Sequence, residues 1–306
     1  MKASIIPTTR ECSKNGIKKE GESCTLNNNC IYPNCKMKNT AIIDADHIFF
    51  LCLTGEKILD ENGEPVKVDG KFTYRERTFE ESCKIADDYI TNILNVTEAD
   101  SYIGFFGGSS AYRKRIYPEY KANRKDLEPL KNLEKMKHYL LDKWGFIWIM
   151  ATVPANNYMH ETDDYVASYY FQNSTTSFIV SPDKDLLNLK GRHYNPKKNE
   201  WVDKTIWDEY RYFWGSMIVG DNADNIPGLK GKAEAFVEKL FADTTNYPER
   251  VLSAYIGHYS NIDLAIEEFY KHYKCLSMVK TLQITTGDVT NSWTPSTVEE
   301  QQLNIE

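Results

Sequence analysis

Short apolar runs alternate with amphipathic stretches over the first two thirds of the chain. Runs at 41–43, 101–106, 146–150 and 178–180 are bounded by polar or turn-forming residues, which indicates buried strands. Residues 201–202 are placed to pair back across a turn at 195–196. Apolar residues recur at helical spacing in 79–94, 127–144 and 163–171. Strands that alternate with helices predict an α/β fold with a central, mostly parallel sheet flanked by helices.

The texture of the sequence changes along the chain and predicts four parts. Residues 1–39 are polar and cysteine-containing and predict an irregular N-terminal extension, whereas 40–205 carry the α/β pattern. Within that pattern, 60–72 hold turn-formers and charges that indicate a surface loop or hairpin. From about 206 to 285 only helices are predicted. Residues 286–306 contain no Lys or Arg and little apolar content, so we expect a disordered tail.

The charge distribution is more informative than the net charge. The chain is globular in composition, with 41% hydrophobic and 26% charged residues and a net charge of −7. Residues 112–143 nevertheless hold ten Lys/Arg against five acids, a local charge of +5. A basic segment inside an acidic protein predicts a surface for phosphate groups. No long apolar run and no export signal are found, so we expect a cytoplasmic protein without membrane contact.

Seven cysteines do not form an obvious disulfide framework in a chain of this length. Cys52, Cys83 and Cys275 lie in apolar or helical stretches and are expected to be buried thiols. The other four are either free thiols or ligands of a structural zinc ion, although their gaps match no common pair of knuckles: Cys12, Cys24, Cys30 and Cys35.

Acidic residues gather just after the predicted strands, where α/β sheets build their sites. A lone aspartate in such a place is usually a helix cap or a solvated turn residue. Several carboxylates in one region would repel one another unless cations neutralised them, and Mg²⁺ and Mn²⁺ prefer such oxygen ligands. We therefore predict a metal site from the joint pattern of Asp44, Glu161, Asp163, Asp164, Asp183, Asp185, Asp221 and Asp224.

A glycine-rich turn at 220–231 has a physical logic of its own. Gly228 and Gly231 allow backbone angles that other residues avoid, so the following helix can present its free amides to a phosphate. Lys230 and Lys232 add positive charge. An ordinary interhelical turn is the alternative.

Five motifs follow one another in a meaningful order. They are AIIDADH (41–47), YRKR with PEYKANR (112–124), HETDD (160–164), SPDKDL (181–186) and GDNADNIPGLKG (220–231). Together they resemble the 5′ nuclease family, which includes bacteriophage flap endonucleases, phage RNase H and the 5′-nuclease domain of bacterial DNA polymerase I. The resemblance implies a PIN-like or Rossmann-like sheet followed by a helix–three-turn–helix region that grips DNA. It also implies a structure-specific 5′-3′ exonuclease or flap endonuclease that removes primers or flaps in replication.

The same resemblance implies roles for individual residues. Asp44, Glu161 and Asp163 would hold one Mg²⁺ or Mn²⁺, and Asp183, Asp185, Asp221 and Asp224 a second, with Asp164 in an outer shell. Lys121 and Arg124 would act on the scissile phosphate. Tyr120 would stack on a base, or else be a packed tyrosine. The expected partner is DNA with 5′ ends or flaps, or an RNA/DNA hybrid, bound by a monomer in the nucleoid or in the cytoplasm of a viral host. The DNA-contacting residues would be Arg113, Arg115, Tyr120, Gly228, Lys230, Gly231 and Lys232.

Two departures from the family keep alternatives open. The family's second metal-binding Asp falls on Phe106 or Gly107, and no acid lies between Ser101 and Tyr112. Asp46 could replace it, because residues two apart in an extended strand share a face, or Asp46 could cap the next helix. The turn also has Lys232-Ala233 where the family has a second glycine pair. A catalytically weakened duplex-binding paralogue and a PIN-like ribonuclease are therefore the rival interpretations, and the 220–231 turn argues against the second.

Overall fold

The central feature is a sheet whose middle strands are parallel. The computed structural model describes residues 39–124, 130–152, 160–243, 246–282 and 291–292. Within these residues the sheet runs in the order β10-β9-β8-β1-β6-β11, and β7 also pairs with β6. The strands are β1 (Thr40–Asp44), β6 (Ser101–Phe106), β7 (Ile147–Trp148), β8 (Ser177–Val180), β9 (Gly191–Asn195), β10 (Glu200–Lys204) and β11 (Asn291–Ser292).

The central strand is apolar because helices cover both of its faces. Every residue of β1 is buried, and the strand pairs in parallel with β6 on one side and β8 on the other. Strands buried on both faces are near-continuous apolar runs, as this one is. The outer β9–β10 pair is an antiparallel hairpin in which Trp201 lies opposite Tyr194. The predicted fold class and the predicted return of residues 201–202 are confirmed.

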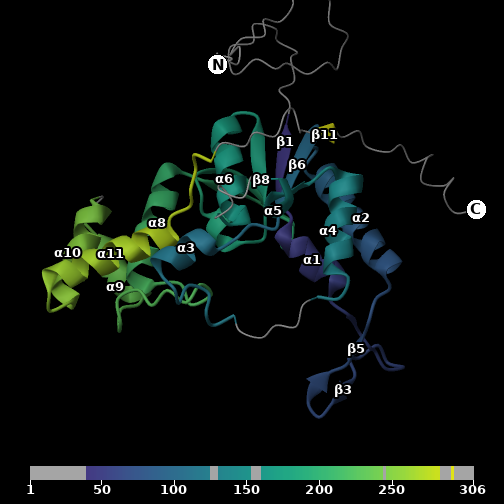
Figure 1. Cartoon of the computed structure of the whole chain (residues 1–306), viewed down its shortest axis with the longest axis horizontal. Helices are drawn as coiled ribbons and strands as arrows, with labels where there is room; N and C mark the ends of the chain where they lie inside the picture. Colours follow the sequence, from purple (N-terminus) through teal and green to yellow (C-terminus); the bar gives the residue numbers. More distant parts are fainter. Residues whose placement is uncertain (1–38, 125–129, 153–159, 244–245, 283–290, 293–306) are drawn as a thin grey trace, which may run out of the picture.

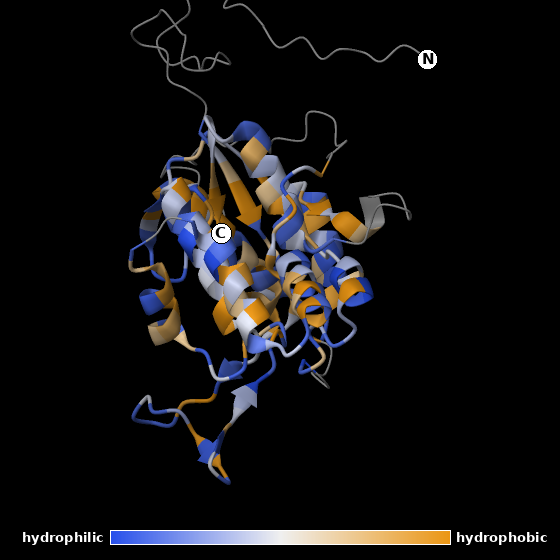
Figure 2. Cartoon of the chain, turned by 90° about the vertical axis from the view of Figure 1, so that its left-hand side faces the viewer, coloured by the Kyte–Doolittle hydropathy of each residue, from blue (hydrophilic) through white to orange (hydrophobic). Residues whose placement is uncertain are grey.

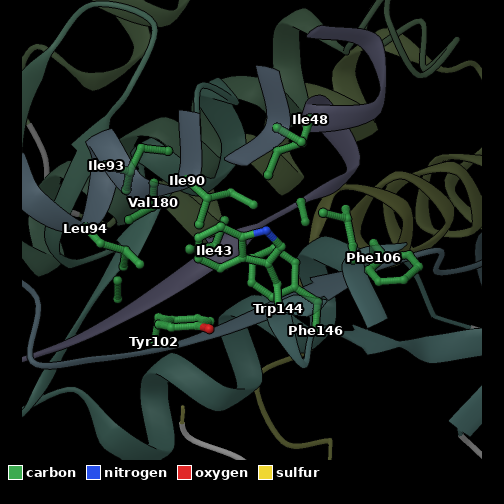
Figure 3. Packing of buried hydrophobic residues seen from close by; sticks show 14 of the residues in the cluster. Ile43, Ile48, Ile90, Ile93, Leu94, Tyr102, Phe106, Trp144, Phe146 and Val180 are labelled. Atoms are coloured by element: carbon green, nitrogen blue, oxygen red, sulfur yellow. The ribbon is translucent and has the colours of Figure 1, made fainter. Parts of the chain in front are cut away.

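Alternate residues of the strands feed two separate cores. Ile43, Phe106 and Val180 face α1 (Asp46–Leu53), α2 (Phe79–Val96) and α4 (Leu133–Trp144), as Figure 3 shows. Ile42 and Ile179 face α6 (Thr162–Asn173) on the other side of the sheet. The helices therefore lie on both faces of the sheet (Figure 1). Figure 2 shows strands of the central sheet in orange, the colour of hydrophobic residues.

The C-terminal helices form a third core beside the sheet. The helices are α8 (Ile206–Val219), α9 (Glu234–Phe241), α10 (Tyr247–His258) and α11 (Ile262–Leu276). They pack through Trp214, Val251 and Phe269. Three short helices complete the described elements: α3 (Ala111–Ile116), α5 (Ile149–Thr152) and α7 (Lys184–Leu187).

The region between α1 and α2 projects from the body as an arm (Figure 1). It holds the two-stranded pairs β2–β5 and β3–β4, with all eight strand residues exposed: β2 (Glu56–Lys57), β3 (Lys67–Val68), β4 (Lys71–Phe72) and β5 (Tyr74–Arg75). The predicted surface hairpin at 60–72 is confirmed.

Some predicted boundaries were wrong. The chain leaves the sheet after Trp148 and forms α5, so the predicted strand at 146–150 is only two residues long. The helix expected from 127 begins at Leu133. Residues 291–292, expected in a disordered tail, form β11 against β6, so helices are not the only elements after 205.

Other expectations are tested only in part. Residues 1–38, which include the four cysteines considered for zinc, lie outside the described residues, as do 283–290 and 293–306. Cys52 and Cys275 are buried thiols, whereas Cys83 is half-buried. In the part of the chain that the structure describes, no helix has the length and apolar character needed to cross a membrane.

Candidate functional site

The carboxyl ends of β1 and β8 lie side by side and are joined through a serine. Ile43 is in register with Val180, so Asp44 and Ser181 are neighbours just beyond the paired residues. Ser181 Oγ donates to Asp44 Oδ2 at 2.8 Å, and the backbone N–H of Asp183 donates to Ser181 Oγ at 3.0 Å. Parallel pairing therefore brings together two acids that are far apart in the sequence.

The first turn of α6 adds further carboxylates to this edge. Glu161 is the N-cap residue of α6, and Asp163 lies in its first turn. Burial, and then the negative charges of Asp44 and Asp183, hold the pKa of Asp163 well above its usual range. Burial and the charge of Asp46 likewise raise the pKa of Asp44 to about 7. The ionised forms of these acids are therefore costly, and bound cations would stabilise them.

A second group of acids comes from α7 and from the turn after α8. Burial raises the pKa of Asp185 to about 6, and Tyr212 OH donates to its Oδ1 at 2.5 Å. Asp221 is buried and accepts from Lys184 Nζ at 2.7 Å. Although burial raises it, the pKa of Asp221 lies below its usual range because Lys184 stabilises the charged form.

The glycines of the turn hold Asp221 in place. Gly220 and Gly228 have φ of 80° and 60°, and they flank the bridge between Asp221 and Ile226. A Cβ on Gly228 would lie 2.4 Å from the nitrogen of Gly220. Gly231 also has a positive φ, 78°, so the backbone freedom expected of Gly228 and Gly231 is used at both.

The predicted catalytic cations contact carboxylates from two elements. Lys121 Nζ is ion-paired with Glu161 and lies 3.6 Å from Asp224 Oδ1. Arg124 Nη2 donates to Asp224 Oδ1 at 2.9 Å. Lys121 has φ of 57°, a strained conformation for a residue with a side chain, and its N–H donates to the carbonyl of Asp224. The basic segment is therefore fastened to the turn after α8.

Tyr120 is a packed side chain and not an exposed stacking platform. It is 1% exposed, and its hydroxyl lies 2.8 Å from Glu161 Oε2 and 2.6 Å from Asp224 Oδ2. A hydroxyl carries one proton, so it donates to one of these carboxylates at a time. Of the two alternatives for Tyr120, the packed tyrosine is the one that the structure shows.

Arg113 and Asp164 also differ from expectation, because they form a buried ion pair. The two guanidinium nitrogens Nη1 and Nη2 donate to Asp164 Oδ2 and Oδ1 at 2.6 and 2.8 Å. Arg113 is 4% exposed and Asp164 is fully buried. Arg113 is thus not on a surface that DNA could reach, and the carboxylate of Asp164 is committed to Arg113. The sequence placed Arg113 in a basic motif and Asp164 in an acidic motif, but did not predict that they pair.

All but one of the remaining predicted DNA contacts are on the surface. Arg115, Lys230, Gly231 and Lys232 are exposed, whereas Gly228 is buried in the turn. Lys232 Nζ lies 4.4 Å from the ring centroid of Phe236, at the start of α9. The helices α8 and α9 with the turn between them have the helix–turn–helix arrangement expected of this segment.

Asp46 reaches the place where β6 lacks an acid. Phe106 points into the core and stacks on Trp148, so it offers nothing to the site. Asp46 Oδ1 accepts from the N–H of Gly107 at 2.9 Å, and its Oδ2 accepts from Thr162 Oγ1 at 2.6 Å. The N-cap position of α1 is Ala45, with no side-chain cap bond. Asp46 therefore does not act as the N-cap; its carboxylate joins the ends of β6 and α6.

The donor set suits hard divalent cations, although the carboxylates are not gathered around one point. They are oxygen ligands of the kind that Mg²⁺ and Mn²⁺ prefer. Among the described residues, no three His, Cys, Asp or Glu side chains are close enough together to hold one ion. Glu161 and Asp221 are instead paired with Lys121 and Lys184. The residues fit such ions in chemistry, in burial and in their unbalanced charge.

Several residues of the site gave no signal of their own in the sequence. Ser181, Thr162 and Tyr212 each donate to a carboxylate of the site, and Lys184 pairs with Asp221. Ser181 and Lys184 lie inside the SPDKDL motif, so their position next to the acids could have identified them. Tyr212 lies on α8 and is brought to Asp185 only by the tertiary fold.

Comparison with known proteins was made by family, by sequence and by structure. No family model matches the chain. DNA polymerase I of Borreliella burgdorferi is 30% identical over 171 residues, which cover 50% of this chain and 17% of that protein. DNA polymerase I of Caldicellulosiruptor bescii is 31% identical over 156 residues, covering 45% and 18%. The chain thus matches less than a fifth of the length of either relative.

The fold has solved counterparts. The flap endonuclease of bacteriophage T5, in a pseudo-enzyme-product complex with DNA and metal ions, is similar with a TM-score of 0.51 and 15% identity. The match covers 78% of this chain and 90% of that chain. The two chains thus share a fold. Sequence and fold together confirm the resemblance to the 5′ nuclease family.

Proposed function

We propose that the chain is a divalent-metal-dependent, structure-specific 5′ nuclease that hydrolyses phosphodiester bonds near 5′ ends or flaps of DNA. The observation that carries the proposal is the convergence of acids from β1, α6, α7 and the 220–231 turn on one edge of the sheet. Burial, together with neighbouring carboxylates, raises the pKa of Asp44, Asp163 and Asp185, so their ionised forms are costly and bound cations would stabilise them. The T5 flap endonuclease, which shares the fold, was crystallised with DNA and metal ions.

We assign the ligands by position in the fold. Asp44, Glu161 and Asp163 would hold one Mg²⁺ or Mn²⁺, and Asp183, Asp185, Asp221 and Asp224 would hold the other. When bound, such cations polarise a phosphodiester and lower the pKa of a water molecule. Ser181 and Tyr212 orient two of these carboxylates, Asp44 and Asp185, by hydrogen bonds.

The cationic side chains act on the phosphate. Lys121 is ion-paired with Glu161 and Arg124 with Asp224, and both cations are partly exposed. Cations that neutralised these acids would release both side chains toward a substrate phosphate, where positive charge stabilises the transition state. We propose 40–205 as the catalytic domain and 206–285 as the duplex-binding region, which contacts the backbone of DNA and so reads structure more than sequence. We also propose that the protein acts as a monomer in the cytoplasm.

The rival proposal is a binding paralogue that recognises 5′ ends but cuts slowly. It is favoured by one observation, the apolar Phe106 at the end of β6. Release of a labelled 5′ fragment from a flap substrate in Mg²⁺ separates the two proposals. A matched pair of variants makes the assay specific: Asp183→Asn should abolish cleavage while duplex binding stays intact or becomes tighter. Asp203→Asn, an exposed acid on β10, should cleave like the wild type. Cleavage by Asp183→Asn at the wild-type rate would refute the assignment of the metal ligands.

A further inference from the structure

A cavity of about 360 Å³ opens from the carboxylates toward α8 and α11. Asp185, Asp221, Ile206 and Lys280 are among the residues that line it. Its volume falls in the range of pockets that bury small organic ligands, about 300–1,000 Å³. None of the roles assigned above to the carboxylates requires this space.

The segment after α11 closes one side of the cavity. Residues 277–282, here called the strap, are tied to α6 by three bonds. Val279 N–H donates to Asp164 Oδ1 at 2.9 Å, Ser168 Oγ donates to the carbonyl of Val279 at 2.9 Å, and Leu282 N–H donates to Ser168 Oγ at 3.1 Å. The ion pair of Lys280 with Glu209 ties the strap to α8. The cavity is therefore a built feature between fixed elements and not a gap between loose ones.

Aromatic side chains make up much of the rest of the lining. Tyr210, Phe213, Trp214 and Tyr273 line the cavity, from α8 and α11. The rings of Phe213 and Tyr273 are nearly perpendicular, with centroids 5.3 Å apart. Trp214 is 7% exposed, and its Nε1 has no hydrogen-bond acceptor in the described part of the protein. Such a wall favours a flat ligand that stacks and carries an acceptor for an N–H group.

We propose that this cavity receives the base of a nucleotide whose phosphate lies at the carboxylate edge. The inference rests on the proposed function, because a phosphate is attracted to Asp185 and Asp221 only through divalent cations. The two kinds of lining residue match the two parts of a nucleotide: acids with cations for the phosphate, and aromatic rings for the base. A base in this cavity is withdrawn from its neighbours in the strand. The site thus selects unpaired nucleotides, which a flap or a frayed end supplies.

The test uses the full chain and thymidine 5′-monophosphate in Ca²⁺, with affinity measured by calorimetry. Tyr273→Ala removes a cavity ring that is 37% exposed, and Tyr270→Ala removes a ring that is 58% exposed on the same helix but outside the cavity. Loss of one stacking partner should weaken binding about tenfold or more for Tyr273→Ala. Tyr270→Ala should bind within about twofold of the wild type.

A second variant guards against a folding defect in the first. Ser277→Leu adds volume to the cavity wall and should also weaken nucleotide binding, and thermal unfolding of each variant shows whether it is folded. Thymidine without its phosphate should bind equally with and without Ca²⁺. Failure of the wild type to bind the nucleotide at millimolar concentration, or equal affinity in all three variants, would overturn the inference. The flap assay on the same proteins is independent: absence of cleavage contradicts the proposed function, whatever the binding result.

Discussion

The buried pair of Arg113 and Asp164 joins α3 and α6 to the end of α11. Arg113 Nε also donates to the carbonyl of Cys275 at 2.9 Å, and Nη2 to that of Ser277 at 3.1 Å. Asp164 also accepts from the N–H of Val279 at 2.9 Å. Although burial raises it, the pKa of Asp164 is held well below its usual range by the neighbouring His160 and by the hydrogen bonds and charge of Arg113. One guanidinium thus connects α3, α6 and the end of α11.

Removing either partner alone should be costly, because the other charge stays buried. Arg113→Met is expected to lower the free energy of unfolding by about 3–5 kcal/mol, and Asp164→Leu by a similar amount. The double variant leaves two carbonyls and the N–H groups of Glu161 and Val279 without these partners. The single variants lose the same partners, at about 1–3 kcal/mol for each group, and each of them also leaves one charge buried without its counter-charge. The double variant lacks that last cost, so it should lose less than the sum of the two single losses.

Urea denaturation followed by far-ultraviolet ellipticity measures these free energies. The matched control is Arg75→Met, which breaks exposed pairs with Glu56 and Glu81 at 2.6 and 2.9 Å. Exposed pairs contribute at most about 1 kcal/mol, so this variant should be close to the wild type. Additive losses in the double variant, or an Arg113→Met variant as stable as Arg75→Met, would refute the reasoning.

Three further predictions concern the turn, the helical core and catalysis. Gly228→Ala should cost several kcal/mol on urea denaturation, because its Cβ would clash with Gly220, whereas Gly231→Ala has open space and should cost only about 1–2 kcal/mol for its positive φ. Burial lowers the pKa of His272 to about 4 despite the nearby Glu268. The neutral side chain therefore contributes fully to the free energy of unfolding above pH 6.5. This contribution, at most about 3 kcal/mol, is lost as the pH falls toward 4. Urea denaturation at several pH values should show this loss in the wild type and not in His272→Gln. Lys121→Ala should lower single-turnover cleavage about a hundredfold with little change in DNA affinity, and a loss confined to affinity would make Lys121 a docking residue.

Local sequence patterns predicted the helices and strands in which burial alone explains the pattern of apolar and polar residues. An apolar run predicted the strand at 101–106. Helical spacing of apolar residues predicted the helix from Phe79, which Thr78 caps in the structure. The run at 146–150 was misjudged, because a short apolar run fits a buried strand and a buried helix equally well. The pairing of β11 with β6 joins residues almost two hundred positions apart, and no local pattern encodes it.

The candidate site was predictable at the level of motifs but not of partners. The acids could be found because each follows a strand, opens a helix or lies in the 220–231 turn, and parallel strands end at the same edge. Charge type did not predict environment: Arg113 and Arg115 are two residues apart in one basic motif, yet one is buried and the other is exposed. Whether a basic side chain faces solvent or an internal carboxylate depends on helix packing, which no local sequence pattern encodes.

The missing acid on β6 shows how the structure changes a hypothesis. Because the family's second metal-binding Asp falls on Phe106 or Gly107, Phe106→Asp would restore a ligand if Asp46 did not replace it. Phe106 is instead fully buried, edge-on to Phe49 and stacked on Trp148, so an aspartate there would place a charge in an apolar core. Asp46 already occupies the end of β6 through its bonds to Gly107 and Thr162. Asp46→Asn should therefore weaken Mn²⁺ binding, measured by calorimetry, nearly as much as Asp44→Asn does. Phe106→Asp should destabilise the fold without improving metal affinity. If Asp46→Asn binds Mn²⁺ like the wild type, Asp46 serves only to join β6 to α6.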